Sequence, residues 1–280
     1  MRNMGTLCTG LLALLVAVAG CGGEAVPHGE DGSAQGRPLI VAGTAMVECA
    51  VRDLAGEALR IHTLAPPGQC PGHFDLKPGD FRAIASSDMM LRHDYQAHFD
   101  ERLRATGGVR RIVELPTTGP QTIPANYLKL TGAIAQHLKE AYPELGETID
   151  ARLEEIAAAQ GEMESLARKD AAALEGRPVI ASNLQAAFCT WLGMQVVGEF
   201  DMADEMSLKQ LGDLVQAGRS QRAVAVVANL QRGDSEGRPI AERLGVPLVL
   251  LSNFPLEPDA PEAHARLLRH NLRQLIEAVQ

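Results

Sequence analysis

The chain has 280 residues, which suits one or two domains, and 46% of them are hydrophobic, which excludes a largely disordered protein. Its 26 basic and 35 acidic side chains give a formal net charge of −9. This balance argues against a nucleic-acid partner, because phosphate binding needs clustered Lys and Arg. Five cysteines are too few for a disulfide scaffold.

The segment 1–20 predicts a secretory signal. Its apolar run, Leu11–Ala19, is too short to cross about 30 Å of hydrocarbon but fits an h-region. It ends in Val18-Ala19-Gly20-Cys21, which resembles a bacterial lipobox. That resemblance implies cleavage before Cys21 and a lipid anchor on it; the alternative is an uncleaved apolar N-terminus. Residues 21–36 are polar and glycine-rich, and we expect a flexible tether.

From residue 37 onward, short β-rich runs alternate with helical runs, a pattern typical of parallel βαβ units. The sequence predicts a first set of strands at Pro38–Gly43, Leu59–Leu64, Asp88–Leu91 and Arg111–Leu115, with helices near Val47–Ala55, Pro78–Ala85 and Ala97–Ala105.

Two helical patterns then follow without strands, Asn126–Ala141 and Glu147–Leu174. The second is amphipathic, because Leu153, Ile156 and Ala157 have i, i+3, i+4 spacing. The predicted second set has strands at Pro178–Ala181, Gln195–Val197, Ala223–Ala228 and Pro247–Leu251, and helices near Leu184–Leu192, Leu208–Ala217, Arg238–Leu244 and Pro261–Val279.

We therefore predict an α/β fold of two four-stranded parallel-sheet lobes, 37–124 and 176–280, joined by a long helical bridge over 125–175. Ligands of open α/β sheets bind beyond the carboxyl ends of the strands. The expected site is a cleft between the two lobes.

Several short motifs occur along residues 38–280 in a fixed order. They are Thr63–Gly68 after the second strand, Phe74-Asp75 with Pro78 and Asp80 (compare H-x-Y/F-E/D-x-x-P-x-D), Trp191–Met194 and Ile240–Gly245. Together they resemble the zinc- and manganese-receptor class of solute-binding proteins of ABC importers. The resemblance implies a rigid, monomeric receptor outside the cytoplasm, anchored by lipid on Cys21, that delivers a metal ion to a permease and its ATPase.

The residues at that family's metal-ligand positions are different here. The resemblance places these positions at Gly72 (next to His73), Gly119, Ser182 or Leu184, and Asn229. None of these residues is a strong zinc ligand.

Polar residues that follow the predicted strands are the candidates to replace them. Cys70 and His73 have Cys-x-x-His spacing, which can place sulfur and nitrogen on one ion and suits a softer ion such as copper(I). We expect the metal site at His73, Cys70 and Asn229, with zinc, manganese and copper left open. The other cleft candidates are Glu48, Asp75, Arg92, His93, Asn183 and Gln185.

Some of these residues also have a structural interpretation. Cys70 and Cys49 are either a disulfide, favoured by an oxidising compartment, or free thiols. We expect Asp75 either to cap the proline-initiated helix after it or to fix the loop. A guanidinium beside a cation site is repulsive. If Arg92 points into the cleft, it indicates an anionic ligand or a metal chelate; we favour the alternative, in which it pairs with Asp94 or Glu48.

No motif supports the hypothesis of an enzyme, since no nucleotide-binding glycine loop, Gly-x-Ser-x-Gly elbow or His-Glu-x-x-His run is present. The predicted function is capture of a transition metal ion for import. One alternative keeps the fold but binds a polar or anionic small molecule or a metal complex, which the amide-rich second lobe would suit. Another is an adhesion or interaction lipoprotein with a degenerate cleft.

Overall fold

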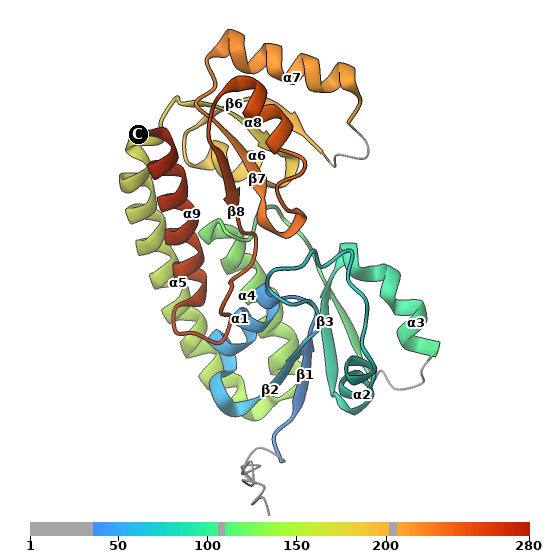
Figure 1. The fold of residues 1–280 in the computed structure, drawn as a ribbon. Helices are drawn as coiled ribbons and strands as arrows, with labels where there is room; N and C mark the ends of the chain where they lie inside the picture. Colours follow the sequence, from blue (N-terminus) through green and yellow to red (C-terminus); the bar gives the residue numbers. More distant parts are fainter. Residues whose placement is uncertain (1–35, 106–109, 202–205) are drawn as a thin grey trace, which may run out of the picture. The chain divides into compact units, whose positions relative to one another are not determined.

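The computed structural model describes residues 36–105, 110–201 and 206–280 (Figure 1). The predicted signal and the lipidation site Cys21 lie outside the described residues. Within the described ranges, each helix is too short or too polar to cross a bilayer.

The first sheet contains four parallel strands in the order β2-β1-β3-β4. They are β1 Leu39–Ala42, β2 Arg60–Thr63, β3 Met89–His93 and β4 Ile112–Leu115. Helix α1 (Ala45–Ala55) follows β1 and begins where the Thr44 hydroxyl accepts a hydrogen bond from the Val47 amide. It ends at Gly56, whose φ of 55° is readily adopted by glycine.

The prediction placed the end of the third strand at Leu91, two residues too early. Arg92 and His93 belong to β3, an inner strand buried along its whole length. A charged residue is tolerated there because Arg92 is paired with two carboxylates, as described below. After β3 the chain forms the 3-10 helix η2 (Asp94–Phe99) and helix α3 (Asp100–Ala105).

The bridge consists of α4 (Pro124–Ala141), the short η3 (Pro143–Leu145), α5 (Gly146–Asp170) and η4 (Ala171–Leu174). Helix α5 contacts both lobes: Ile149 belongs to the first hydrophobic core, and Met163 and Ala167 to the second. The C-terminal helix α9 (Ala263–Val279) lies beside α5 (Figure 1). It also contacts both lobes, because Leu267 belongs to the first hydrophobic core and Leu268 to the second.

The second sheet repeats the first in the order β6-β5-β7-β8, again all parallel. Its strands are β5 Pro178–Ser182, β6 Gln195–Phe200, β7 Ala225–Asn229 and β8 Leu248–Leu251. Its helices are α6 Asn183–Trp191, α7 Leu208–Gln221 and α8 Arg238–Leu244, besides α9.

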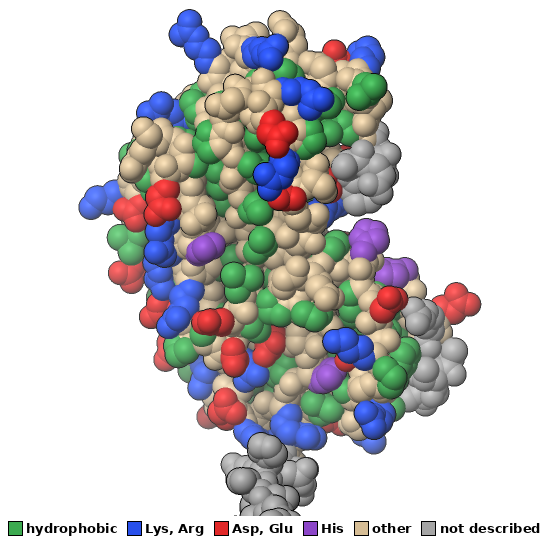
Figure 2. All heavy atoms as spheres, in the orientation of Figure 1, with side chains coloured by type: hydrophobic (Ala, Val, Ile, Leu, Met, Phe, Trp, Pro, Cys, Tyr) green, Lys and Arg blue, Asp and Glu red, His purple; other side chains and the backbone are tan. Residues whose placement is uncertain are grey.

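The predicted fold class, two four-stranded parallel-sheet lobes with a long helical bridge, is confirmed. The boundaries drawn at residues 124 and 175 stay a prediction, because residues 36–280 form a single compact unit. The surface of this unit is hollowed between the first-sheet and second-sheet parts, on the right of Figure 2.

Candidate functional site

The carboxyl ends of the two sheets meet through one amide. Gln231 lies in the 3-10 helix η6 (Leu230–Arg232), directly after β7. Its Nε2 donates to the Pro67 carbonyl oxygen at 3.0 Å and to Ser252 Oγ at 2.8 Å. Its Oε1 accepts from the Asn253 amide at 3.1 Å. A loop of the first lobe is thereby held against two strand ends of the second, which places the predicted cleft at this edge.

The second lobe's amides largely satisfy one another. Asn229 is buried, its Nδ2 donates to Gln231 Oε1 at 3.3 Å and its Oδ1 accepts from the Arg232 amide at 3.2 Å. Gln185 Nε2 donates to the Leu251 carbonyl at 3.1 Å and to Asn253 Oδ1 at 2.8 Å. The Asn229 oxygen is therefore already engaged with the Arg232 amide, and a ligand that needs both of its lone pairs would have to displace that hydrogen bond.

The second lobe also contains buried oxygens that lack a partner. Ser182 Oγ and Gln185 Oε1, at the β5–α6 junction, make no hydrogen bond with a described residue, and in the first lobe neither does Thr122 Oγ1 before α4. Buried polar groups usually carry a partner. These positions therefore leave hydrogen-bonding capacity for a solute or for water. Asn183, beside them, is exposed at the start of α6.

The loop after β2 brings Cys70 and His73 together, as their spacing predicts. Cys70 Sγ lies 3.5 Å from His73 Nδ1, and the His73 amide donates to the Cys70 carbonyl at 3.0 Å, which closes the turn. Gln96 in η2 supports this loop by donating to the Pro71 carbonyl at 3.4 Å and to the Gly43 carbonyl at 3.0 Å. His73 is exposed and Cys70 half-buried, so both can be reached from solvent. No pattern in the sequence indicates the supporting role of Gln96.

His93 lies at the end of β3, fully buried, and its ring stacks on Tyr95 with 5.2 Å between ring centres. Neither ring nitrogen makes a hydrogen bond of normal geometry. Burial lowers the pKa of His93 to about 4, against opposing effects of Asp94 and of the Leu115 carbonyl. The imidazole is therefore neutral near pH 7, the form that binds metal.

Arg92 is paired, but the predicted partners Asp94 and Glu48 are wrong. Its guanidinium bonds Asp100 through Nε at 2.7 Å and Nη2 at 2.6 Å, and Glu114 through Nη1 at 2.8 Å. The α3 helix begins at Asp100 and presents this carboxylate to the buried side of β3. The Arg92 bonds lower the pKa of Asp100. The guanidinium is thus occupied and adds no free cation to the cleft.

Asp75 is exposed and does not cap the following helix, contrary to expectation. Helix α2 (Pro78–Ser86) is capped by Asp80, whose Oδ2 accepts from the Lys77 amide at 2.7 Å. Pro78 occupies the first helical position, so the acid that can reach the cap lies inside the helix rather than before it.

Glu48 is also occupied. Its Oε2 accepts from the Thr63 hydroxyl at 2.5 Å, and its Oε1 bonds Arg52 Nε at 3.0 Å. The bond to Thr63 joins α1 to the end of β2, and the bond to Arg52 lies within α1.

The alternative of a Cys49–Cys70 disulfide is not realised. Both thiols are free, and Cys49 packs inside the first lobe with its Sγ 3.2 Å from the Tyr127 hydroxyl. Among the described residues, no three or more His, Cys, Asp or Glu side chains are grouped closely enough to hold a metal ion. Cys70 and His73 are therefore a pair of potential ligands without a third of these types beside them.

Comparison with solved structures defines the class first. The fold resembles the periplasmic zinc-binding protein TroA of Treponema pallidum (TM-score 0.73, 15% identity, covering 87% of this chain and 99% of that one). It also resembles the Mn-bound periplasmic metal-binding protein of Candidatus Liberibacter asiaticus (0.72, 11%, 87% and 100%). A third is the laminin-binding protein Lmb of Streptococcus agalactiae, described as a bifunctional adhesin and metal transporter (0.72, 14%, 88% and 100%). What this chain shares with them is the fold, two α/β lobes joined by a helical bridge.

The sequence identifies the family within that class. Residues 40–278 match the family described as zinc-uptake complex component A, periplasmic, and the chain belongs to it. A search of curated proteins finds no significant match. Family membership confirms the resemblance drawn from the order of the motifs.

Proposed function

We propose that the chain is a lipid-anchored receptor outside the cytoplasm that captures a transition metal ion and passes it to an ABC permease and its ATPase. Family membership over residues 40–278 and the two-lobed fold support the transport role. The chain is in this proposal a monomeric receptor and not an enzyme, tethered by lipid on Cys21. Zinc and manganese are the ions bound by the similar structures TroA and the Liberibacter protein.

The single observation that carries the metal proposal is the 3.5 Å approach of Cys70 Sγ to His73 Nδ1. Both atoms lie at the edge where Pro67, in the same loop, meets Gln231 of the second lobe. Thiolate with imidazole is a ligand pair for zinc or copper(I) and a poor one for manganese. Asn229 is proposed as a weaker, second-lobe oxygen ligand, and buried His93 as a further imidazole.

A second candidate follows from the absence of a third strong ligand among the described residues. Two protein ligands leave a zinc ion incompletely coordinated. A metal complex that carries ligands of its own would complete the sphere, and its polar groups would bond the free oxygens of Ser182 and Gln185. The adhesion alternative has less support, because the likeness to Lmb is a likeness of fold.

The test is metal analysis of the full chain, purified without a tag in detergent and loaded in turn with zinc, manganese and copper(I). We expect one zinc or copper ion per chain, lost in both Cys70→Ser and His73→Ala. His270→Ala, which removes an exposed histidine from α9, is the matched control and keeps the metal. Retention of metal by His73→Ala would refute the assigned site. No metal in the wild type under any loading would leave the metal complex as the cargo to test.

A further inference from the structure

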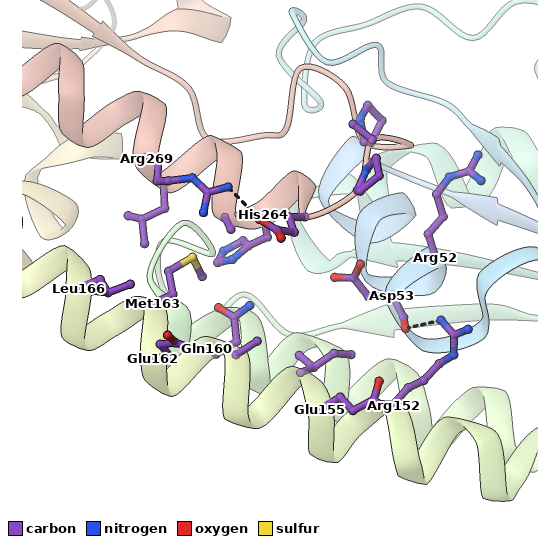
Figure 3. A pocket seen from close by; sticks show the side chains of 18 of the residues that line it. Arg52, Asp53, Arg152, Glu155, Gln160, Glu162, Met163, Leu166, His264 and Arg269 are labelled. Carbon is purple, nitrogen blue, oxygen red and sulfur yellow. Dashed lines mark hydrogen bonds and ion pairs between the residues drawn. The ribbon is translucent and has the colours of Figure 1, made fainter.

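A second cavity lies away from the cleft, between α1, α5 and the start of α9 (Figure 3). Its volume is about 710 Å³, enough for a small organic molecule. None of the residues proposed for the metal site lines it. Its lining combines an apolar wall with buried polar atoms that lack partners.

His264, on the first turn of α9, supplies one of these atoms. Its Nε2 lies 2.8 Å from the Gln121 carbonyl oxygen, and because a carbonyl only accepts, Nε2 carries the proton. The Nδ1 atom is then an acceptor, and it is buried without a partner. Burial lowers the pKa of His264 to about 4, so the ring keeps this acceptor near pH 7. The ring itself is fixed by stacking on Tyr127, with 3.9 Å between ring centres.

Gln160, on α5, supplies a second acceptor on the opposite wall. Its residue exposure is 7%, and its Oε1 is buried and has no hydrogen-bond partner. In Figure 3 its amide points toward the His264 ring. No hydrogen bond joins the two side chains, so the space between them is suited to a group with more than one donor. A buried acceptor without a partner destabilises the protein, and a bound donor would remove that penalty.

A carboxylate points into the same space. Asp53, at the end of α1, faces the middle of the cavity in Figure 3. Its Oδ2 accepts a 2.5 Å hydrogen bond from the Tyr127 hydroxyl. The apolar wall beside it includes Met163, Leu268 and Leu272.

The charges around the cavity favour a cation. Of its three arginines, Arg52 is paired with Glu48 and Arg269 with Glu262, whereas Arg152 hydrogen-bonds the Asp53 carbonyl and keeps its positive charge. Four lining acids make no ion pair with another described residue; these are Glu155, Glu162, Asp170 and Asp259. An incoming cation would therefore meet uncompensated negative charge at the rim.

We propose that this cavity binds a small organic amine, whose ammonium group donates hydrogen bonds to Gln160 Oε1, His264 Nδ1 and the Asp53 carboxylate. The hydrocarbon part of the amine lies on Met163 and Leu268. The site is distinct from the metal site, and its occupant is independent of whether a metal is bound.

The test is titration calorimetry of the full chain in detergent with cadaverine, a linear diamine. Pentanediol and glutarate, of similar length, are the neutral and anionic comparators. We expect one cadaverine per chain and at least tenfold weaker binding in Gln160→Met, a loss of about 1.4 kcal/mol. Met keeps the length of the side chain and removes both polar atoms. Glu154→Gln, on the same helix but outside the cavity, is the matched control and binds as the wild type does.

A second variant separates binding from folding. Asp53→Asn retains an oxygen that can accept from the Tyr127 hydroxyl but removes the charge, and we expect it to weaken cadaverine binding at least tenfold with little change in melting temperature. His73→Ala keeps full cadaverine binding, which distinguishes this site from the metal site. Absence of cadaverine binding, equal binding of pentanediol or glutarate, or unchanged affinity in Gln160→Met would each overturn the proposal.

Discussion

The Gln231 side chain donates a 3.0 Å hydrogen bond to the Pro67 carbonyl and so ties the loop after β7 to the loop after β2. The same amide bonds Ser252 Oγ and the Asn253 backbone. One nearly buried amide thus connects the loop that carries Cys70 and His73 with two strand ends of the second sheet. We infer that it sets the spacing of the two lobes at this edge.

Replacing Gln231 by Leu is expected to lower the free energy of unfolding by about 2 kcal/mol. The side chain keeps a similar size, but the Pro67 carbonyl and the Asn253 amide lose their partner inside the protein. Urea denaturation measures the change. Gln136→Ala, an exposed glutamine on α4, is the control and should stay within about 0.5 kcal/mol of the wild type. Equal loss in the two variants would mean that Gln231 does not hold the lobes together.

Of the cysteines in the described ranges, Cys70 alone should react with a thiol reagent in the native protein. Cys49 and Cys189 are 1% and 0% exposed, and burial raises the pKa of each thiol to about 12. Because the thiolate is the reactive form, both are doubly protected. Peptide mass analysis after alkylation, with and without denaturant, counts the modified sites.

The same alkylation tests the metal pair. Zinc or copper(I) added beforehand should slow the modification of Cys70 in the wild type, because the metal occupies the thiolate. In His73→Ala this protection should largely disappear. Labelling of Cys49 or Cys189 at the rate of Cys70 would show that the native interior opens more readily than the packing indicates.

The Arg92 pair is expected to contribute strongly to stability. Arg92→Met leaves Asp100, itself 8% exposed, without its main partner, and we expect a loss of about 3–5 kcal/mol in the free energy of unfolding. Arg110→Met breaks a surface pair with Asp88 and should cost about 0–1 kcal/mol. Urea denaturation compares the two, and similar losses would contradict a structural role for the buried pair.

These cases show how far the sequence alone leads. Alternating β-rich and helical runs predicted both sheets and the bridge, because strand and helix periodicity are local properties. The extension of β3 through His93 was missed, since it depends on Asp100 and Glu114, which lie 8 and 22 residues away from Arg92. The helix cap is a second example: Asp80 accepts from the Lys77 amide, three residues before it, and Asp75 does not. The direction of the backbone decides which carboxylate reaches this amide.

The candidate site was predictable only in part. The approach of Cys70 to His73 follows from their spacing in one turn. The amide network around Asn229 and Gln185 does not, because Asn253 reaches Gln185, and Ser252 and Asn253 reach Gln231, from the end of another strand, β8. A single sequence shows which polar residues follow strands, but it does not show which of them form hydrogen bonds with one another.

Stability should fall as the pH is lowered from about 6.5 to about 4, in part through His93. Its pKa in the folded protein is about 4, below the unfolded value of 6.5, so the unfolded chain binds more protons in this window. The contribution is fully present above about pH 6.5 and is lost toward pH 4, and it amounts to about 3 kcal/mol for this residue. The pKa of buried His264 is lowered in the same direction, so its protonation also reduces the free energy of unfolding as the pH falls.

His93→Leu isolates this contribution, because it removes the titrating ring and leaves every other group in place. Urea denaturation at a series of pH values measures the free energy of unfolding of both proteins. The curve of the variant should be flatter between about pH 6.5 and 4, so the difference between the two proteins shifts in favour of the variant as the pH falls. His98→Leu, at an exposed histidine of η2, is the matched control for the loss of an imidazole. Parallel curves for wild type and His93→Leu would mean that His93 already takes up a proton in the folded state at its ordinary pKa.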